Sequence, residues 1–235
     1  MGNDLLLLQK LFPMLSILKK YKIFLITMLV FAVIFLSVSY RLLQPRKVLK
    51  IYTPSDVNPE LADTTIQNVT KAHAIADFSF INQNGKTITQ KDYAGKIYVA
   101  DFFFTTCQTI CPIMTDNMVA VQNAIKDNPK VMILSHSVFP DQDSVPVLKK
   151  YAVEKGVDDR KWNLVTGNKK DIYYIARKSY LAVKTGNPAE MYDMVHTENF
   201  VLVDTKRRIR GFYDGTKKEE IKRLIDDIAT LSTED

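Results

Sequence analysis

The chain has 235 residues, of which 46% are hydrophobic and 25% are charged, so it can bury a core and is not intrinsically disordered. Two cysteines are too few for a disulfide-rich scaffold or a four-cysteine zinc site. They allow one disulfide, one dithiol pair or one metal site. The net charge of +6 is too small and too dispersed for a nucleic-acid-binding surface, so we expect no nucleic acid partner.

An uncharged run near the N-terminus, residues 23–40, reads IFLITMLVFAVIFLSVSY. It is long enough to cross about 30 Å of hydrocarbon as a helix. A buried helix of a soluble protein would carry a polar face, and a cleavable signal peptide has a shorter apolar stretch. We therefore predict an uncleaved transmembrane anchor, preceded by residues 1–22. Basic residues flank the run equally on both sides, so charge leaves its orientation open.

Residues 41–70 contain three prolines and no sustained hydrophobic period, which predicts an extended tether. The folded domain is expected over residues 71–235. It opens on a β-hairpin around Asn84-Gly85, because this dipeptide between two apolar runs is a strong hairpin signal.

The rest of the domain alternates between strand-like and helix-like segments. Residues 96–104 form an apolar run that is typical of a strand buried on both faces. A helix is expected from Pro112 to Lys126, since proline suits a first helical turn. Later strands are expected at 131–138, 161–165, 200–204 and 208–213, and later helices at 144–154, 169–178 and 216–231. This order predicts an α/β sandwich with a mixed central sheet.

Both cysteines, Cys107 and Cys111, follow the first buried strand at the point where a helix begins. The carboxyl end of a strand is where sites form in open α/β sheets. A spacing of four places two side chains on one helical face, and the free amides of a helix N-terminus favour thiolate. The pair can bind a soft metal or close into a disulfide. A purely structural disulfide and two unrelated buried cysteines are the alternative interpretations.

A third ligand would complete a trigonal copper(I) site, since thiolate selects the monovalent ion and imidazole suits copper. The chain has three histidines. His73 precedes the first strand and is interpreted as solvent-exposed, and His136 lies within a strand and is interpreted as a core residue. His196 lies in a polar loop before a strand, and loops carry functional residues. It is therefore the candidate ligand, although spacing alone leaves its role open.

The segment Thr106–Met114 (TCQTICPIM) resembles the SCO/SenC family of thioredoxin-fold copper proteins, which support assembly of the binuclear copper centre in cytochrome c oxidase subunit II. The resemblance extends over about residues 75–230. Further similar blocks are Asp101–Phe104, Ser137–Leu148, Trp162–Gly167, Val195-His196 and Phe200–Asp204.

The resemblance implies a thioredoxin-like fold and copper held by Cys107, Cys111 and His196, as Cu(I), with Cu(II) left open. It also implies cytochrome c oxidase subunit II as partner. The implied location is the inner membrane, with the soluble domain on the periplasmic or outer side. Phe139 departs from the family, which usually has an aspartate there, and Asp141 or Asp143 is a candidate substitute.

Two functions from different classes follow from these residues. A copper(I) metallochaperone would use both cysteines and His196, whereas a thiol–disulfide reductase that keeps oxidase cysteines reduced would use the cysteines alone. A peroxidase is a weaker alternative, because its reactive cysteine needs a nearby arginine. No arginine lies between Arg46 and Arg160 in the sequence.

Overall fold

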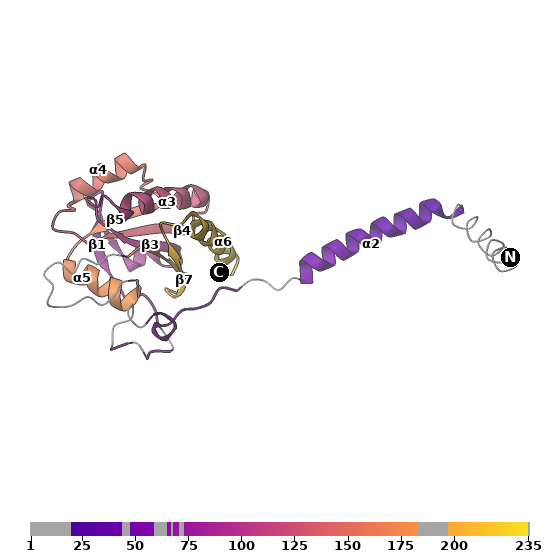
Figure 1. The fold of residues 1–235 in the computed structure, drawn as a ribbon, viewed down its shortest axis with the longest axis horizontal. Coiled ribbons are helices and arrows are strands. Elements are labelled where there is room, and N and C mark those ends of the chain that lie inside the picture. The colour runs from indigo at the N-terminus through magenta and orange to yellow at the C-terminus, as the bar shows by residue number, and fades with distance from the viewer. Residues whose placement is uncertain are drawn as a thin grey trace, which may run out of the picture. The chain divides into compact units, whose positions relative to one another are not determined.

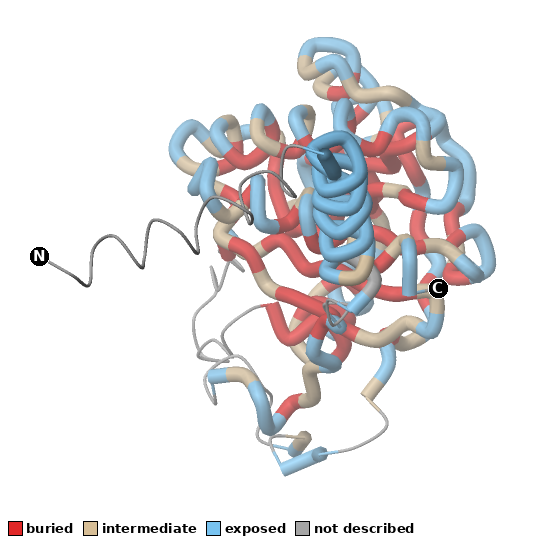
Figure 2. Tube along the Cα trace, turned by 90° about the vertical axis from the view of Figure 1, so that its right-hand side faces the viewer, coloured by how far each residue is buried: buried red, intermediate tan, exposed pale blue. Residues whose placement is uncertain are grey.

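The computed structural model describes residues 20–43, 48–58, 65–66, 68–70, 73–182 and 197–234. The chain divides into two compact units, Met1–Lys47 and Val48–Asp235, which are described separately (Figure 1). The first contains the helix α2 (Lys22–Leu43). Its segment Lys22–Tyr40 is long and apolar enough to cross a membrane, and none of it is buried (Figure 2). The helix therefore extends slightly beyond the predicted span, residues 23–40.

The second unit is built on a seven-stranded sheet with the order β2-β1-β5-β4-β3-β6-β7. The strands are β1 (Ser79–Asn82), β2 (Thr87–Thr89), β3 (Ile97–Phe103), β4 (Val131–Ser137), β5 (Trp162–Thr166), β6 (Asn199–Val203) and β7 (Ile209–Asp214). Strands β3, β4 and β5 are parallel, and the remaining pairs are antiparallel. The predicted mixed sheet is thus confirmed. So is the hairpin of β1 and β2, where Gly85 adopts a φ of 73°.

Helices cover both faces of this sheet. They are α3 (Ile110–Ile125), α4 (Val145–Lys155), α5 (Lys169–Tyr174), the π-helix η3 (Ile175–Ser179) and α6 (Lys218–Glu234), with short 3₁₀ turns η1 (Pro54–Asp56) and η2 (Gln90–Tyr93). Figure 1 shows α3 and α4 on one face and α5 on the other. We call these the α3 face and the α5 face.

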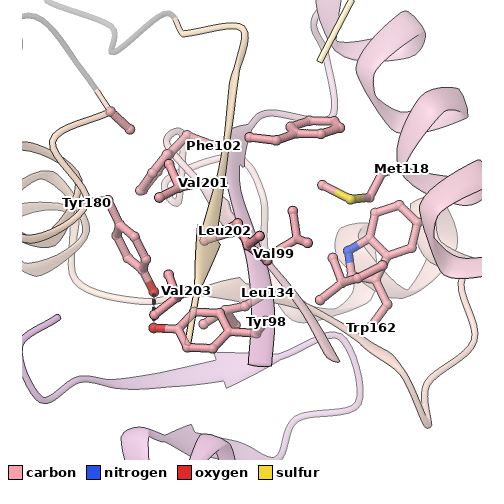
Figure 3. Close-up of a cluster of buried hydrophobic side chains, with 14 of the residues drawn as sticks. Tyr98, Val99, Phe102, Met118, Leu134, Trp162, Tyr180, Val201, Leu202 and Val203 are labelled. Atoms are coloured by element: carbon pink, nitrogen blue, oxygen red, sulfur yellow. Dashed lines mark hydrogen bonds between the residues drawn. The ribbon is translucent and has the colours of Figure 1, made fainter. Parts of the chain in front are cut away.

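Strand β3 is buried along its whole length, as its apolar run predicts. Successive side chains of a strand point to opposite faces, so both layers of the core contact it. On the α5 face, Tyr98 and Phe102 pack against Tyr180, and the two tyrosine hydroxyls lie 3.2 Å apart (Figure 3). On the α3 face, Val99 points toward the side of Met118 and Trp162. Because β3 is packed on both faces, its carboxyl end and the start of the following loop are held in place.

The folded unit begins earlier than residue 71, the start that the sequence predicts. Part of the expected tether, residues 48–58, packs against the C-terminal half of the domain. The Leu49 carbonyl accepts a hydrogen bond from the buried Arg210 guanidinium at 2.7 Å, and Tyr52 forms an isolated bridge to β7. The physical reason is that β7 is an edge strand with free backbone groups, and that the buried Arg210 has N–H groups beyond those paired with Asp204 and Glu234.

Candidate metal and redox site

The two cysteines lie where β3 ends and α3 begins. Cys107 is half-buried in the connecting loop, and its N–H donates to the Phe104 carbonyl at 3.3 Å. Cys111 is the second residue of α3 and is only 3% exposed. Cys107 therefore precedes the helix, so the two residues do not share a helical face as the spacing predicts. Their thiols are still close enough for each to shift the pKa of the other.

The two thiols have opposite tendencies to ionise. Partial burial opposes ionisation of Cys107, but hydrogen bonds from the Cys111 amide and from Thr109 outweigh it and lower the pKa of the Cys107 thiol to about 7. The Thr109 hydroxyl lies 3.6 Å from the Cys107 sulfur. Burial raises the pKa of Cys111 to about 12, and the adjacent Cys107 adds to this effect. Near neutral pH about half of the loop cysteine is thus ionised, whereas the helical cysteine is protonated.

A buried aspartate holds the start of the cysteine loop. The Asp143 side chain accepts hydrogen bonds from the Thr105 hydroxyl at 2.5 Å, the Thr105 amide at 3.2 Å and the Ser137 hydroxyl at 2.5 Å. Asp141 is exposed. Phe139, where the family usually has an acid, packs edge-on against Phe104 with ring centroids 6.3 Å apart.

A second polar cluster, which the sequence did not indicate, lies under the site on the α3 face. Asp101 accepts a short hydrogen bond from Ser135, whose oxygen accepts from the Trp162 indole at 2.7 Å. Burial raises the pKa of Asp101 to about 7, although the Ser135 bond works against this. The sequence signals were a single acid within an apolar strand and the resemblance of the block Asp101–Phe104 to the family. The register of β3 and β4, which pairs Asp101 with Ser135, reveals its partner.

Two of the three histidines are engaged elsewhere. His136 is fully buried on the α5 face and stacks on Phe102 with ring centroids 5.0 Å apart. Burial lowers its pKa to about 3, so it is a neutral core residue, as predicted. His73 was expected to be exposed, but it is half-buried and its Nε2 lies 2.7 Å from the Ser179 carbonyl. That carbonyl satisfies the ring and accounts for its burial.

His196 lies outside the described residues. Its strand, β6, begins three residues later at Asn199 and runs antiparallel to β3, with Ala100 opposite Val201. This register places the first residue of β6 at the carboxyl end of β3, the same edge from which the cysteine loop starts. Among the described residues, no group of three or more histidine, cysteine, aspartate or glutamate side chains is arranged to hold a metal ion.

Known proteins share this fold and about a third of the aligned sequence. The family model of SCO1/SenC matches residues 66–233. A SCO1 protein homolog of Bacillus subtilis is 32% identical over 163 residues, which span 68% of this chain and 84% of the relative.

Two solved structures of relatives extend the comparison. BsSco, a member of the Sco family of cytochrome c oxidase assembly proteins in which a disulfide switch was identified, is 33% identical with a TM-score of 0.59. The match covers 68% of this chain and 94% of BsSco. ScoI of Arabidopsis thaliana, solved with copper bound, is 27% identical with a TM-score of 0.55 over 70% of this chain and 100% of that one. The mixed sheet is thus the thioredoxin-like sheet of Sco structures, and the chain belongs to the SCO1/SenC family.

Proposed function

We propose that this protein is a membrane-anchored copper(I) metallochaperone that supports assembly of the binuclear copper centre of cytochrome c oxidase. One observation carries the proposal. A cysteine with a lowered pKa and a buried cysteine lie together at the carboxyl end of β3, next to the first residue of β6. Membership of the SCO1/SenC family, with a copper-bound structure among its members, supports the choice of metal.

The proposed ligands are Cys107, Cys111 and His196. Two thiolates select copper(I), and one imidazole completes a trigonal set. Neither described histidine can take this place, because His136 packs among aromatic rings on the α5 face and His73 is bonded to Ser179. The first residue of β6, three positions after His196, lies at the carboxyl end of β3, which supports His196 as the third ligand.

The helix α2 would hold the domain at the inner membrane, on its periplasmic or outer side. In this proposal the copper site would face the compartment that the family resemblance implies, and subunit II of the oxidase would be the recipient. The metal is then cargo rather than a resident cofactor, and a half-exposed Cys107 allows a partner's thiol to reach it.

The test is copper(I) binding by the full-length, reduced chain in detergent. We expect one ion per chain and an X-ray absorption spectrum with two sulfurs and one nitrogen. His196→Ala should remove the nitrogen and weaken binding, whereas His73→Ala, the matched histidine control, should change neither. A sulfur-only spectrum for the wild-type chain, or unchanged affinity after His196→Ala, would refute the three-ligand site.

A second candidate function is reduction of disulfides in an oxidase subunit. The arrangement of one accessible cysteine with a pKa of about 7 beside a buried partner favours it, because such a pair can attack a disulfide and then resolve the mixed disulfide. His196→Ala distinguishes the two functions. If this variant still assembles the oxidase at limiting copper, the reductase function replaces the chaperone function.

The two functions share one redox consequence. Oxidation should join Cys107 to Cys111 and abolish copper binding, because the same sulfurs cannot do both. Mass spectrometry should detect the loss of two hydrogens on mild oxidation. Copper retained by the fully oxidised chain would contradict a site made of these sulfurs.

A further inference from the structure

We propose that Asp143 is a positioning residue for the cysteine pair. Its carboxylate holds the start of the cysteine loop in place. It thereby sets the copper(I) affinity of Cys107 and Cys111 and the stability of the disulfide between them. The copper part of this inference rests on the proposed function, and the disulfide part does not.

The contacts of Asp143 use both carboxylate oxygens. Oδ1 accepts from the Thr105 hydroxyl at 2.5 Å, and Oδ2 accepts from the Ser137 hydroxyl at 2.5 Å and from the Thr105 amide at 3.2 Å. The amide also lies 3.4 Å from Oδ1. The residue has no exposed surface. A carboxyl group can receive all three donors because both of its oxygens accept hydrogen bonds.

The support behind Asp143 is itself rigid. Its amide donates to the Phe139 carbonyl at 3.0 Å, and the Ser137 oxygen accepts from the Phe139 amide at 3.1 Å. Ser137 is the last residue of β4, and the next amide, that of Val138, donates to the Phe103 carbonyl at 2.8 Å. The carboxylate therefore joins the ends of two central strands to the loop that starts from one of them.

The loop needs this support because it contains little regular structure. Between the end of β3 at Phe103 and the start of α3 at Ile110, Thr105 is bonded to Asp143, and the Cys107 amide is bonded to the Phe104 carbonyl. Thr105 is two residues before Cys107. Holding its backbone limits the positions that the Cys107 sulfur can sample relative to Cys111. Such preorganisation raises the effective concentration of one thiol at the other.

The loss of a hydrogen-bond partner that supports metal ligands typically lowers metal affinity by ~10–100-fold. Asp143→Asn keeps the shape but replaces one acceptor oxygen with an NH₂ group, which faces existing donors. We expect the copper(I) affinity of the full-length chain to fall by about this factor. Asp141→Asn, which removes one exposed carboxylate from the same segment, should leave the affinity unchanged.

The disulfide equilibrium tests the inference without copper. In glutathione buffer, the protein dithiol and oxidised glutathione exchange with the protein disulfide and two reduced glutathione molecules. Asp143→Asn should shift this equilibrium about tenfold or more toward the dithiol, in line with the lost preorganisation. Gln122→Ala serves as the stability control, since its buried amide bonds the Gly156 carbonyl, about three turns along α3 from Cys111. It should lower the melting temperature and leave the equilibrium unchanged.

Substitutions of Thr105 test the inference independently if the Asp143→Asn chain does not fold. Thr105→Val removes the hydroxyl that bonds Asp143, and Thr105→Ser keeps it. The valine variant should shift the disulfide equilibrium in the same direction, and the serine variant should restore it. A folded Asp143→Asn or Thr105→Val chain with the wild-type equilibrium would overturn the inference. Absence of copper binding by the wild-type chain would refute the proposed function alone, because the glutathione measurement still tests Asp143.

Discussion

Two neighbouring residues of β4 show how differently the two faces of the sheet are used. His136 points to the α5 face, where it stacks on Phe102 among other aromatic rings. Its Nε2 atom has no hydrogen-bond partner within the described residues. Ser137 points to the α3 face, where its hydroxyl donates to Asp143. Both side chains are fully buried and polar, yet only one of them belongs to the hydrogen-bond network of the cysteine site.

The difference follows from the pleat of the strand. Side chains alternate between faces, so one position decides whether a polar residue meets the cysteine loop or the aromatic layer. On the α3 face, Asp101 and Asp143 are each hydrogen-bonded to a serine of β4. A buried polar side chain therefore indicates a functional site only where the groups that contact it are also polar. The aromatic layer of the α5 face should therefore respond to mutation through stability, and the residues bonded to the cysteine loop on the α3 face should respond through chemistry.

Removal of a thiol is expected to have the largest effect on the α3 face. Cys107→Ser should abolish both copper(I) binding and the disulfide, because a hydroxyl is neither a soft ligand nor a redox partner. Since Cys107 is half-buried in a loop, the melting temperature should change little. Copper titration and differential scanning calorimetry on the same chain check both statements. Copper affinity close to wild type would place the site elsewhere.

Truncation of His136 should produce the opposite pattern on the α5 face. His136→Ala leaves a cavity among aromatic rings and should lower the free energy of unfolding by about 3 kcal/mol. His136→Phe fills the same space without an unpartnered nitrogen and should be close to neutral. Urea unfolding measures the loss, and copper(I) affinity should be unchanged in the phenylalanine variant. A loss of copper binding there would contradict the division between the two faces.

Local patterns were enough to predict much of this architecture. The apolar run of β3, the Asn84-Gly85 turn and the cysteines after a buried strand each depend on neighbouring residues, and all three appear as predicted. The core position of His136 also follows from its strand. Family resemblance, rather than spacing, is the basis for the proposed copper function and for the proposed role of His196.

Long-range contacts explain what the sequence did not predict. Asp143 meets Thr105 across 38 positions, and Leu49 meets Arg210 across 161. Neither contact has a local pattern, so the loop support and the packing of residues 48–58 were not anticipated. His73 was expected to be exposed for the same reason, since its partner Ser179 is distant in sequence. Cys107 precedes α3 because the helix begins at Ile110, and helix boundaries are poorly defined by sequence.

The buried carboxyl of Asp101 should make stability depend on pH. Burial raises its folded-state pKa to about 7, whereas an unfolded aspartate has a pKa of about 3.9. The folded state therefore holds the proton more tightly, and its stabilisation is complete below about pH 4 and is lost as pH rises through about 7. Between pH 5 and pH 8 the free energy of unfolding should fall by about 2–3 kcal/mol.

Asp101→Asn should remove that loss, because an amide does not titrate. Urea unfolding of both chains at pH 5 and pH 8 measures the difference. The variant keeps an acceptor for Ser135, so it should remain folded. Parallel pH profiles for the two chains would show that Asp101 is ionised in both states.

The smallest expected effect concerns the ionisation of Cys107. With a pKa of about 7, its thiolate fraction should rise about tenfold between pH 6 and pH 8 and then level off. An ordinary cysteine, with a pKa of about 8.5, would still be rising steeply at pH 8. The rate of alkylation by iodoacetamide, measured on the reduced chain, reports this fraction. Cys111 should not contribute, since burial raises its pKa to about 12.

Two variants then identify what lowers the pKa of Cys107. Cys111→Ala removes a thiol that helps to lower the pKa of Cys107, and Thr109→Val removes the hydroxyl 3.6 Å from its sulfur. Each should move the midpoint of the alkylation profile to higher pH, while the backbone amides of α3 keep it below the value of a free cysteine. A midpoint near pH 8.5 in the wild-type chain would mean that this end of β3 does not stabilise a thiolate. The α3 face would then lose its chemical distinction, since copper(I) and disulfide exchange both begin from that charge.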